Sequence, residues 1–446
     1  MKVNRIFIFE FISGGGFINQ EIPSSLFSEG FGMLRSIIKD FYRLNIEVET
    51  LLDHRIYKFS KYLDASKIEI VNKNENFIIK FSNALKKCDS AFIIAPEFSN
   101  ILLNLSLKAE KLGKKILSTN INGIKIGTSK VKTIKFFKKI GVPVPKTWTI
   151  PLRKISLIKS FILKKFKEFK TPLILKPVDG VGAESIFYIN STSKVNQIFN
   201  NVRENLDLNR QYMLQEFVNG SDLSLSIVSP FIERENQDFS KNILLCINEQ
   251  YIKLEEKEGR LNYIGGQAPA VNHSLIQEKL QDHLQKFNRM KIRGYFGVDL
   301  IRKMDNSFSF IELNPRLTTS YLGLRKVLNM NPIEILLFMN TDEIENINLK
   351  FDGFSQFFHH ELIYNGSDKF SKIEEDIIPK IVSEIPEMIT PPINLEKPDT
   401  KSHNILSCFL VLKEKDIENI RERMREINKI LQKYDFELLK RYDQNN

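Results

Sequence analysis

The chain has 446 residues, of which 42% are hydrophobic and 27% are charged, and its formal net charge is +11. A chain of this length and composition can fill the cores of two or three domains, which excludes a disordered or fibrous protein. No run approaches the ~18 consecutive apolar residues of a membrane span, and Met1 leads into a strand-like segment instead of a charged and then apolar leader, so we expect a cytoplasmic protein with no membrane partner.

Residues 1–125 alternate between strand-like and helical patterns. Alternation of this kind predicts a parallel α/β layer. The strand-like runs are Ile6–Phe11, Ile46–Leu52, Ala91–Ala95 and Lys115–Ser118. The clearest helical pattern is formed by Leu26, Leu34, Ile37, Ile38 and Phe41.

Three consecutive glycines, Gly14, Gly15 and Gly16, follow the first predicted strand in the stretch "SGGGF". The carboxyl end of a parallel strand is where open α/β sheets bind ligands, but the stretch lacks the G-x-G-x-x-G spacing of a dinucleotide site. Two interpretations stay open: the glycines contact a substrate carboxylate or amine, or they only turn the chain. Ser24 or Ser25 is expected to cap the helix that follows.

A helix with Ser129 as its cap and Lys130 in its first turn is predicted to begin the next unit. Further along, the strand "PLILKP" brings Lys176 to the loop "VDGVGAE", in which Gly180 and Gly182 allow the backbone to approach an anion. This is not a Walker loop, because no G-x-x-x-x-G-K-[ST] spacing leads into a helix. We interpret it as a phosphate-covering loop between antiparallel strands, with an ordinary glycine-rich hairpin as the alternative.

The stretch "LQEFVNGSDLS" at residues 214–224 has the composition of an adenosine site. Its apolar strand supplies an acid and an aromatic residue at Gln215–Val218, and Asp222 follows six residues after Glu216. These residues can line an adenine pocket and bind a ribose hydroxyl. A plain strand, turn and strand is the alternative interpretation.

The stretch "GVDLIRKMDNSFSFIELNPR" predicts a hairpin with Asp305 and Asn306 as its two central turn residues. That register places Asp299 opposite Glu312, with Asn314 on the same face. Two opposed carboxylates repel each other unless a cation separates them, and Mg²⁺ suits a site of one or two carboxylates. Two solvated acids on an exposed hairpin are the alternative. The reverse face is expected to pack in the core through Phe296, Val298, Leu300, Ile311 and Leu313.

Residues 341–446 have the pattern of a small α+β appendage, with strand-like runs in "SQFFHHELIYN" and "ILSCFLVL" and a final amphipathic helix. The polar stretch "GGQAPAVNH", which contains Gln267, Asn272 and His273, is a candidate for the wall of a substrate pocket. His273 fits a surface loop equally well.

The cysteines and the charge distribution indicate which metals and macromolecules the chain is expected to bind. Cys88, Cys246 and Cys408 lie far apart without C-x-x-C spacing, which disfavours a zinc site and suits packing in a reducing compartment. The positive charge is diffuse, and its densest patch, "LKKFKEFK" at 163–170, has the apolar spacing of a solvated helix, which disfavours nucleic acid as a partner.

The order of these motifs resembles the ATP-grasp superfamily of carboxylate–amine or thiol ligases. The resemblance covers about residues 90–340 and is most specific in "FIELNPRLTTSY" and "LKPVDGVGAE". Within the superfamily, the chain is most similar to the group that includes the tyramine–glutamate ligase of methanofuran biosynthesis. The resemblance implies an N-terminal α/β pre-ATP-grasp domain at 1–125 and an ATP-grasp domain at 126–340, which divides into a lid at about 126–205 and a metal and nucleotide part at about 206–340. The α+β appendage at 341–446 is not covered.

The resemblance also implies roles for individual residues. Two departures from the family pattern are Ser129, where many relatives have Asp, and Asp222, where the ribose acid is often Glu. The phosphate-binding residues would be Lys130, Lys176, Gly180 and Gly182, and the adenosine-binding residues would be Gln215, Glu216, Phe217, Val218 and Asp222. The metal ligands would be Asp299, Glu312 and Asn314, and the catalytic residues would be Arg316, on the transferred or acyl phosphate, and Lys176.

The predicted activity is ATP-dependent ligation of a carboxylate to an amine through an acyl phosphate. It uses ATP and Mg²⁺, with Mn²⁺ as an alternative ion, and takes a small-molecule carboxylate and a small-molecule amine as substrates. A homo-oligomer is left open. The alternatives are kinase-like or thiol-ligating chemistry on the same fold, a nucleotide-dependent oxidoreductase, and a basic nucleic-acid-binding protein.

Overall fold

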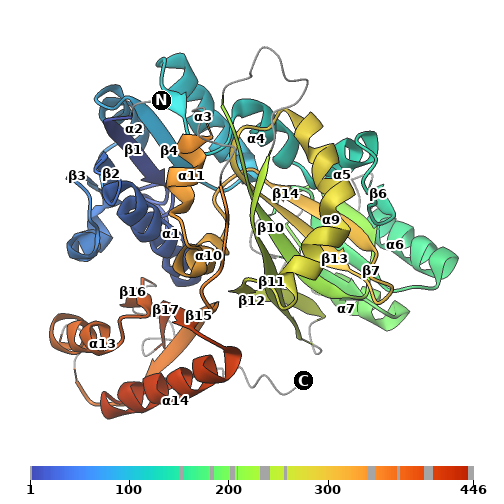
Figure 1. Cartoon of the computed structure of the whole chain (residues 1–446). Helices are drawn as coiled ribbons and strands as arrows, with labels where there is room; N and C mark the ends of the chain where they lie inside the picture. The colour runs from blue at the N-terminus through green and yellow to red at the C-terminus, as the bar shows by residue number, and fades with distance from the viewer. Residues whose placement is uncertain are drawn as a thin grey trace.

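The computed structural model places an N-terminal parallel layer beside a larger antiparallel sheet, with a smaller C-terminal unit below both (Figure 1). The region of the chain that the structure describes consists of residues 3–150, 155–180, 185–200, 206–207, 209–231, 242–255, 259–339, 347–368, 372–395 and 405–439. Gly182, one of the predicted phosphate-loop residues, lies outside these ranges.

The N-terminal layer is a five-stranded parallel sheet in the order β3-β2-β1-β4-β5. This confirms the predicted parallel α/β layer. The prediction missed β3, an edge strand in which Lys67 and Glu69 alternate with isoleucines. The strands are β1 (Arg5–Glu10), β2 (Glu47–Asp53), β3 (Lys67–Val71), β4 (Ser90–Ile94) and β5 (Lys115–Ile116), and the helices are α1 (Ser24–Tyr42), α2 (Phe77–Lys86) and α3 (Ile101–Lys111).

Helix α1 begins at Ser24, after Pro23, and no side chain caps its first turn. The predicted cap at Ser24 or Ser25 is therefore wrong. Ser24 is buried, and its hydroxyl accepts a hydrogen bond from the backbone of Leu395, at 3.1 Å. Its oxygen therefore joins α1 to the C-terminal unit.

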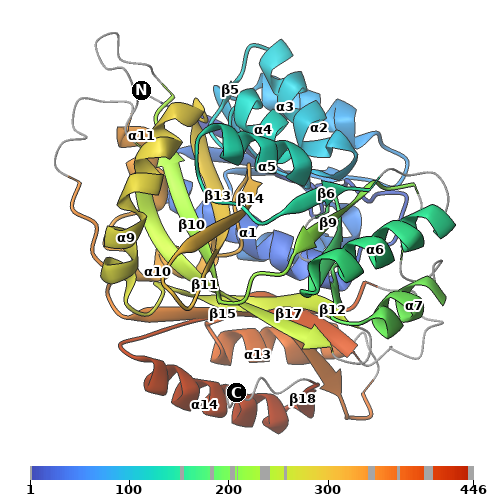
Figure 2. The same ribbon diagram turned by 90° about the vertical axis from the view of Figure 1, so that its right-hand side faces the viewer.

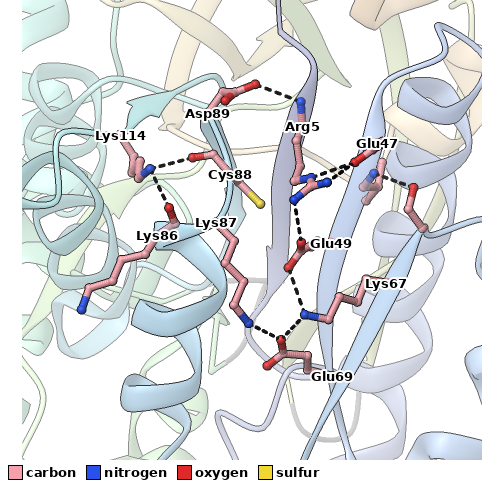
Figure 3. Close-up of polar contacts among 12 residues, drawn as sticks. Arg5, Glu47, Glu49, Lys67, Glu69, Lys86, Lys87, Cys88, Asp89 and Lys114 are labelled. Carbon is pink, nitrogen blue, oxygen red and sulfur yellow. Dashed lines mark hydrogen bonds and ion pairs between the residues drawn. The ribbon is translucent and has the colours of Figure 1, made fainter.

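Charged residues form a ladder at the amino end of the parallel sheet (Figure 3). The Arg5 Nε atom donates to Glu47 at 2.7 Å, and the Glu69 carboxylate on β3 accepts from Lys67 at 2.7 Å and from Lys87 at 2.8 Å. Exposed pairs of this kind contribute little to stability individually. The opposite, carboxyl end of the sheet is the end at which open parallel sheets bind ligands.

The second sheet is antiparallel, with the strand order β14-β13-β10-β11-β12-β8-β7-β9-β6 along its main path. Its strands are β6 (Thr147–Thr149), β7 (Leu173–Pro177), β8 (Phe187–Ile189), β9 (Tyr212–Glu216), β10 (Ser221–Ser229), β11 (Ile243–Glu255), β12 (Arg260–Ala268), β13 (Gly294–Arg302) and β14 (Phe308–Asn314). The helices of this region are α4 (Ile121–Gly127), α5 (Lys130–Lys139), α6 (Ile155–Phe169), α7 (Thr192–Asn200), α9 (His273–Phe287), α10 (Tyr321–Val327) and α11 (Pro332–Phe338).

The β13–β14 hairpin confirms the predicted pairing of Asp299 with Glu312, although the turn differs from the prediction. The strands pair Arg302 with Phe308, so the connection is longer than two residues, and the register then shifts between Asp299 and Leu300. The extra residue of this bulge is Ile311. A longer turn and a β-bulge thus cancel each other and restore the predicted register at the two acids.

The bulge also corrects the predicted reverse face. Ile311 does not join the core, because the bulge turns it toward the cavity described below. Phe310 takes the buried position instead. The other predicted core residues, Phe296, Val298, Leu300 and Leu313, are buried as expected.

The C-terminal unit continues the antiparallel sheet and has a small core of its own. Its first strand, β15, pairs with β12 on one side and with β17 on the other. In Figure 2, α13 and α14 lie below these strands. The elements are β15 (Phe354–Tyr364), α13 (Ile378–Glu384), β16 (Met388–Ile393), β17 (Ile405–Glu414), α14 (Ile417–Lys433) and β18 (Phe436–Leu438). Among the described residues, no helix combines the length and apolar character needed to cross a membrane.

A buried ion pair joins the N-terminal layer to the second half of the chain. The Asp40 carboxylate on α1 accepts from the Arg325 Nε atom on α10 at 2.6 Å and from the Tyr321 hydroxyl at 2.6 Å. The side chains of Asp40 and Arg325 are only 3% and 4% exposed. The pair therefore fixes how α1 sits against α10, and α1 lines the cavity described below.

We expect Asp40→Ala to lower the free energy of unfolding by about 3–5 kcal/mol, because it leaves the Arg325 charge buried without its partner. The measurement is urea unfolding followed by circular dichroism. The control is Asp352→Ala, which breaks an exposed pair with Lys413 and should leave the transition almost unchanged. Equal effects of the two variants would show that the buried pair does not hold α1 in place.

Candidate active site

A cavity of about 490 Å³ lies between the carboxyl edge of the parallel sheet and one face of the antiparallel sheet. On the N-terminal side it is lined by Ile12, which follows β1, and by Ile94, Ala95 and Pro96 at the end of β4. These neighbouring strands are the point where the strand order of the sheet reverses. Ligands of open α/β sheets bind in the crevice at such a point.

Every predicted site residue that the structure describes lines this one cavity. The antiparallel sheet contributes most of them through β7, β9, β10, β13 and β14. These residues are Lys130, Lys176, Gly180, Gln215, Glu216, Phe217, Val218, Asp222, Asp299, Glu312, Asn314 and Arg316.

Lys130 links three segments of the site. It is the first residue of α5, after the Ser129 cap, as predicted. Its Nζ atom donates to the Gly180 carbonyl oxygen at 2.6 Å and forms an ion pair with Glu312, and its backbone amide donates to Val178 at 2.8 Å. Lys130 therefore holds together the start of α5, the glycine loop and the β13–β14 hairpin, which carries Asp299 and Glu312.

Lys176 is buried on β7, and within the described part of the chain its ammonium has no hydrogen-bond or ion-pair partner. Burial lowers the pKa of Lys176 to about 8, while Glu312 opposes this shift and Lys130 reinforces it. An unpaired buried ammonium is costly unless an anion joins it. Lys176 is therefore the cation of this site that is free to receive a phosphate.

Asp299 and Glu312 face each other across the hairpin, with Asn314 beside them. The Asn314 amide donates to the Asp299 carboxylate at 2.8 Å, and the Gln250 amide donates to it at 3.3 Å. Burial raises the pKa of Asp299 to about 6, and the charge of Glu312 adds to this shift. A cation bound beside the pair would therefore stabilise the ionised form of Asp299.

This oxygen-rich arrangement fits Mg²⁺, which binds proteins through one or two carboxylates and completes its shell with water and substrate phosphates. Among the described residues, no three His, Cys, Asp or Glu side chains form a group that could hold a metal by themselves. A magnesium ion at Asp299 and Glu312 would accordingly share its coordination with a bound nucleotide.

The cavity wall formed by β7, β9 and β11 has the character of an adenosine site. Gln215 is buried, and its amide donates to the Thr147 hydroxyl at 3.0 Å. The ring of Phe217 meets Tyr188 edge to face at 4.9 Å. Burial raises the pKa of Asp222 to about 6. The apolar surface of this wall comes from Ile174, Ile186, Val218, Ile252, Leu254 and Leu261.

Arg316 lies where the hairpin meets the N-terminal layer. Its Nε atom donates to Glu97 at 3.0 Å, and another guanidinium nitrogen donates to the Leu317 carbonyl at 3.1 Å. Glu97 follows β4, so this contact crosses between the two sheets. It directs the guanidinium toward the cavity from a fixed position.

Sequence reasoning missed the contribution of α1 and β12. Glu29 and Met33 line the cavity from α1, and Tyr263 lines it from β12. A signal was present, since Leu26, Glu29 and Met33 recur at spacings of three and four residues and therefore share one helix face.

The three glycines do not line the cavity. They allow a turn to pack directly on the phenylalanine cluster: a Cβ at Gly14 would lie 2.4 Å from the Phe9 ring, and one at Gly16 would lie 2.5 Å from the Phe11 ring. Gly15 has a φ of +94°, which side-chain-bearing residues rarely adopt. Of the two open interpretations, the plain turn is the one that this structure supports.

The stretch "GGQAPAVNH" also lies away from the cavity, because Gln267, Asn272 and His273 are not among its lining residues. Gln267 is buried and accepts from the Gln356 amide at 3.0 Å, which joins β12 to β15. Gln267 therefore has a structural role, and the structure does not place this candidate stretch in the cavity wall.

Two family models match the chain, a pre-ATP-grasp domain over residues 46–124 and an ATP-grasp domain over residues 128–320. The second match runs from the cap of α5 through the glycine loop to the end of the hairpin. The chain belongs to the ATP-grasp superfamily.

This chain aligns with nearly the whole length of two curated relatives. The tyramine–L-glutamate ligase of Methanocaldococcus jannaschii is 28% identical over 359 residues, which are 79% of this chain and 94% of the relative. The enzyme of the same name from Methanocaldococcus fervens is 29% identical over 326 residues, 72% of this chain and 89% of the relative. These relatives confirm the predicted class of enzyme, an ATP-dependent ligase.

Solved structures confirm the ATP-grasp fold. The biotin carboxylase domain of 2-oxoglutarate carboxylase from Hydrogenobacter thermophilus, in complex with MgADP, ADP and bicarbonate, has a TM-score of 0.65 at 13% identity and covers 99% of this chain and 92% of its own. An ATP-grasp superfamily protein from Archaeoglobus fulgidus has a TM-score of 0.57 at 19% identity and covers 92% of this chain and 100% of its own.

Lys176 gives a pH-dependent prediction for this ATP-grasp chain. Only the ammonium form attracts phosphate, so nucleotide affinity should fall as the pH rises through about 8. Lys176→Ala should weaken affinity about 10- to 100-fold at lower pH, since a hydrogen bond to a charged group is lost. Lys176→Arg should bind without this pH dependence, because a guanidinium stays charged. The measurement is titration with a fluorescent ATP analogue on both sides of pH 8.

The control for this prediction is Lys164→Ala, which removes an exposed lysine of α6. It should leave the affinity and its pH dependence unchanged. A pH-independent affinity in the unaltered chain, or equal weakening by the two alanine variants, would contradict a phosphate contact at Lys176.

Proposed function

We propose that this chain joins a carboxylate of glutamate to the amino group of tyramine or a similar arylalkylamine, with conversion of ATP to ADP and phosphate. The observation that carries the proposal is that the buried ammonium of Lys176, the opposed carboxylates of Asp299 and Glu312, and Arg316 converge on one cavity. Similarity to tyramine–L-glutamate ligases over most of the chain supports the choice of substrates.

The reaction has two steps. An oxygen of the carboxylate attacks the γ-phosphorus of ATP, the bond to the bridging oxygen of ADP breaks, and an acyl phosphate forms. The amine nitrogen then attacks the acyl carbon, the bond from that carbon to the phosphate oxygen breaks, and the amine loses its proton as the amide forms. Phosphate therefore leaves with one oxygen of the original carboxylate.

The residues contribute mainly by position and charge. Lys176 offers a buried cation to the phosphates, and Arg316 offers a guanidinium held by Glu97 to the transferred phosphoryl group. Gln215–Val218 and Asp222 would hold the adenosine, and Lys130 and Gly180 would shape the phosphate end. Fixed charges of this kind supply most of the rate acceleration in phosphoryl transfer. The role of Gly182 and the division of the chain at residues 125 and 340 stay predictions.

Asp299, Glu312 and Asn314 would hold the magnesium ion. When bound there, Mg²⁺ neutralises the charge of the phosphate oxygens and makes the γ-phosphorus a better electrophile. The three side chains are already directed toward one another by the hairpin register and by the Asn314 amide.

The experiment that tests the proposal incubates the chain with ATP, glutamate and tyramine and measures ADP, phosphate and the amide by mass spectrometry. We expect the amide and phosphate to appear in equal amounts and only when all three substrates are present. A stable phosphorylated acid without amide would indicate kinase-like chemistry. Turnover with thiols in place of amines would indicate a thiol ligase, and either result would contradict the proposed reaction.

We expect Glu312→Gln to lower turnover by at least about 100-fold, because it removes one of the two metal-binding carboxylates and the partner of Lys130. Circular dichroism should show an intact fold, since the apolar reverse face of the hairpin is unchanged. The control on the same hairpin is Asp305→Asn, at an exposed turn position, which should keep normal activity. Near-normal turnover of a folded Glu312→Gln protein would contradict the metal site.

A further inference from the structure

One face of α1 forms the wall of the cavity on the N-terminal side. Leu26, Glu29 and Met33 line the cavity together. Ile12, which follows β1, and Phe98, which follows β4, complete this wall. A single carboxylate therefore stands in a wall that is otherwise apolar.

The Glu29 carboxylate has no ion-pair partner among the described residues. It accepts a hydrogen bond from the Thr319 hydroxyl. Arg316 also lines the cavity, but its Nε atom is bound to Glu97. Burial raises the pKa of the Glu29 carboxyl, and Arg316 only partly opposes this. One guanidinium thus faces two carboxylates, Glu29 and Glu97, so a cation bound beside Glu29 would stabilise its ionised form.

A third carboxylate lies behind the helix. Glu10, at the end of β1, accepts from the backbone amides of Ile12 and Ser13 at 2.9 and 2.7 Å. It sits under α1 because residue 30 is glycine: a Cβ there would lie 2.8 Å from the Glu10 carboxyl carbon. Burial raises the pKa of Glu10 to about 7, so this carboxyl adds only part of a negative charge behind the wall.

The backbone beside Phe98 is held in an unusual conformation. The next two residues, Ser99 and Asn100, both have positive φ values, 52° and 56°. Consecutive left-handed residues outside glycine are uncommon, and such strain is concentrated at ligand sites. Here it follows the residue that places an aromatic ring at the cavity.

We propose that this wall, formed by Ile12, Leu26, Glu29, Met33 and Phe98, is the subsite for the amine substrate. The Glu29 carboxylate binds the ammonium group, and the apolar side chains contact the hydrocarbon or aryl part of the molecule. This inference rests on the proposed function, since it assigns one of the two co-substrates of that reaction to a place in the cavity.

The chemistry of the wall distinguishes the co-substrates. The Glu29 carboxylate would repel the phosphates of ATP and the carboxylates of glutamate. These anions would also lose their hydrating water against the apolar side chains without gaining a hydrogen-bond partner. A primary arylalkylammonium ion matches both features, a cation at one end and an apolar body at the other. Arg316 also lines the cavity and interacts electrostatically with Glu29, so an amine held at Glu29 would lie near an acyl group held by the guanidinium.

The test is steady-state kinetics of Glu29→Gln, which keeps an oxygen to accept from Thr319 and removes only the charge. The KM for tyramine should rise about 10- to 100-fold, because a charged hydrogen bond is lost, while the KM values for ATP and glutamate stay within about 3-fold of normal. Leu26→Ala should raise the KM for tyramine and leave that for methylamine unchanged. The control Glu47→Gln, at the amino end of the same parallel sheet, should change none of these values.

The outcomes separate this inference from the proposed function. A rise in the KM for glutamate alone would show that Glu29 binds the α-ammonium of the amino acid and would overturn the amine subsite. Unchanged KM values in an active Glu29→Gln enzyme would overturn it as well, and the ligase assignment would stand. Failure of the unaltered chain to form any amide would instead overturn the proposed function.

A second measurement covers the case in which the Glu29 variant does not fold. It uses the unaltered chain with two tyramine analogues, a quaternary arylalkylammonium ion and the corresponding alcohol. The quaternary ion should inhibit competitively against tyramine and more strongly than the alcohol, because only it carries the charge. Equal inhibition by both analogues would contradict a carboxylate at the amine subsite.

Discussion

The interaction on which the site depends is the close placement of two partly buried carboxylates, Asp299 and Glu312. Like charges on opposed strands destabilise a sheet unless other groups compensate for them. Here Lys130 binds Glu312, and the amides of Asn314 and Gln250 bind Asp299. The compensation is local and incomplete, which leaves the site prepared for a cation and for the phosphates that accompany it.

The need to compensate the charges of Asp299 and Glu312 brings together elements that are far apart in the sequence. Lys130 reaches Glu312 only because α5 begins beside the glycine loop, where its backbone and side chain contact Val178 and Gly180. Lys176 is buried in the same site, and burial lowers its pKa to about 8 while the charges of Glu312 and Lys130 act on it in opposite directions. On the other side, Arg316 is held by Glu97 at the edge of the parallel sheet, and Asp40 with Arg325 holds α1 against α10. The cavity is therefore formed jointly by both sheets.

The sequence predicted the site better than it predicted the local geometry around it. The pairing of Asp299 with Glu312 is correct, although the two-residue turn assumed for it is not, because a longer connection and the bulge at Ile311 compensate for each other. Alternation of apolar residues cannot reveal such a pair of opposite irregularities. The predicted cap of α1 is wrong because the Ser24 hydroxyl accepts a hydrogen bond from the distant residue Leu395, and a local sequence pattern cannot reveal such a contact.

The contribution of α1 to the cavity could not be derived from helix periodicity alone. The apolar face containing Leu34, Ile37 and Phe41 packs in the core, and the face containing Leu26, Glu29 and Met33 differs from it by only part of a turn. Which of two neighbouring faces meets a cavity is decided by the partner sheet, and that is information from tertiary structure. The three glycines illustrate the converse, since their small size serves the packing of Phe9 and Phe11.

The central claim is that this cavity activates a carboxylate by transferring to it the γ-phosphoryl group of ATP. The most direct measurement uses glutamate labelled with ¹⁸O in its carboxylates, together with ATP and tyramine, and analyses the released phosphate by mass spectrometry. An acyl phosphate intermediate requires that each phosphate released with amide formation carry one labelled oxygen. Unlabelled phosphate formed in step with the amide would contradict the account.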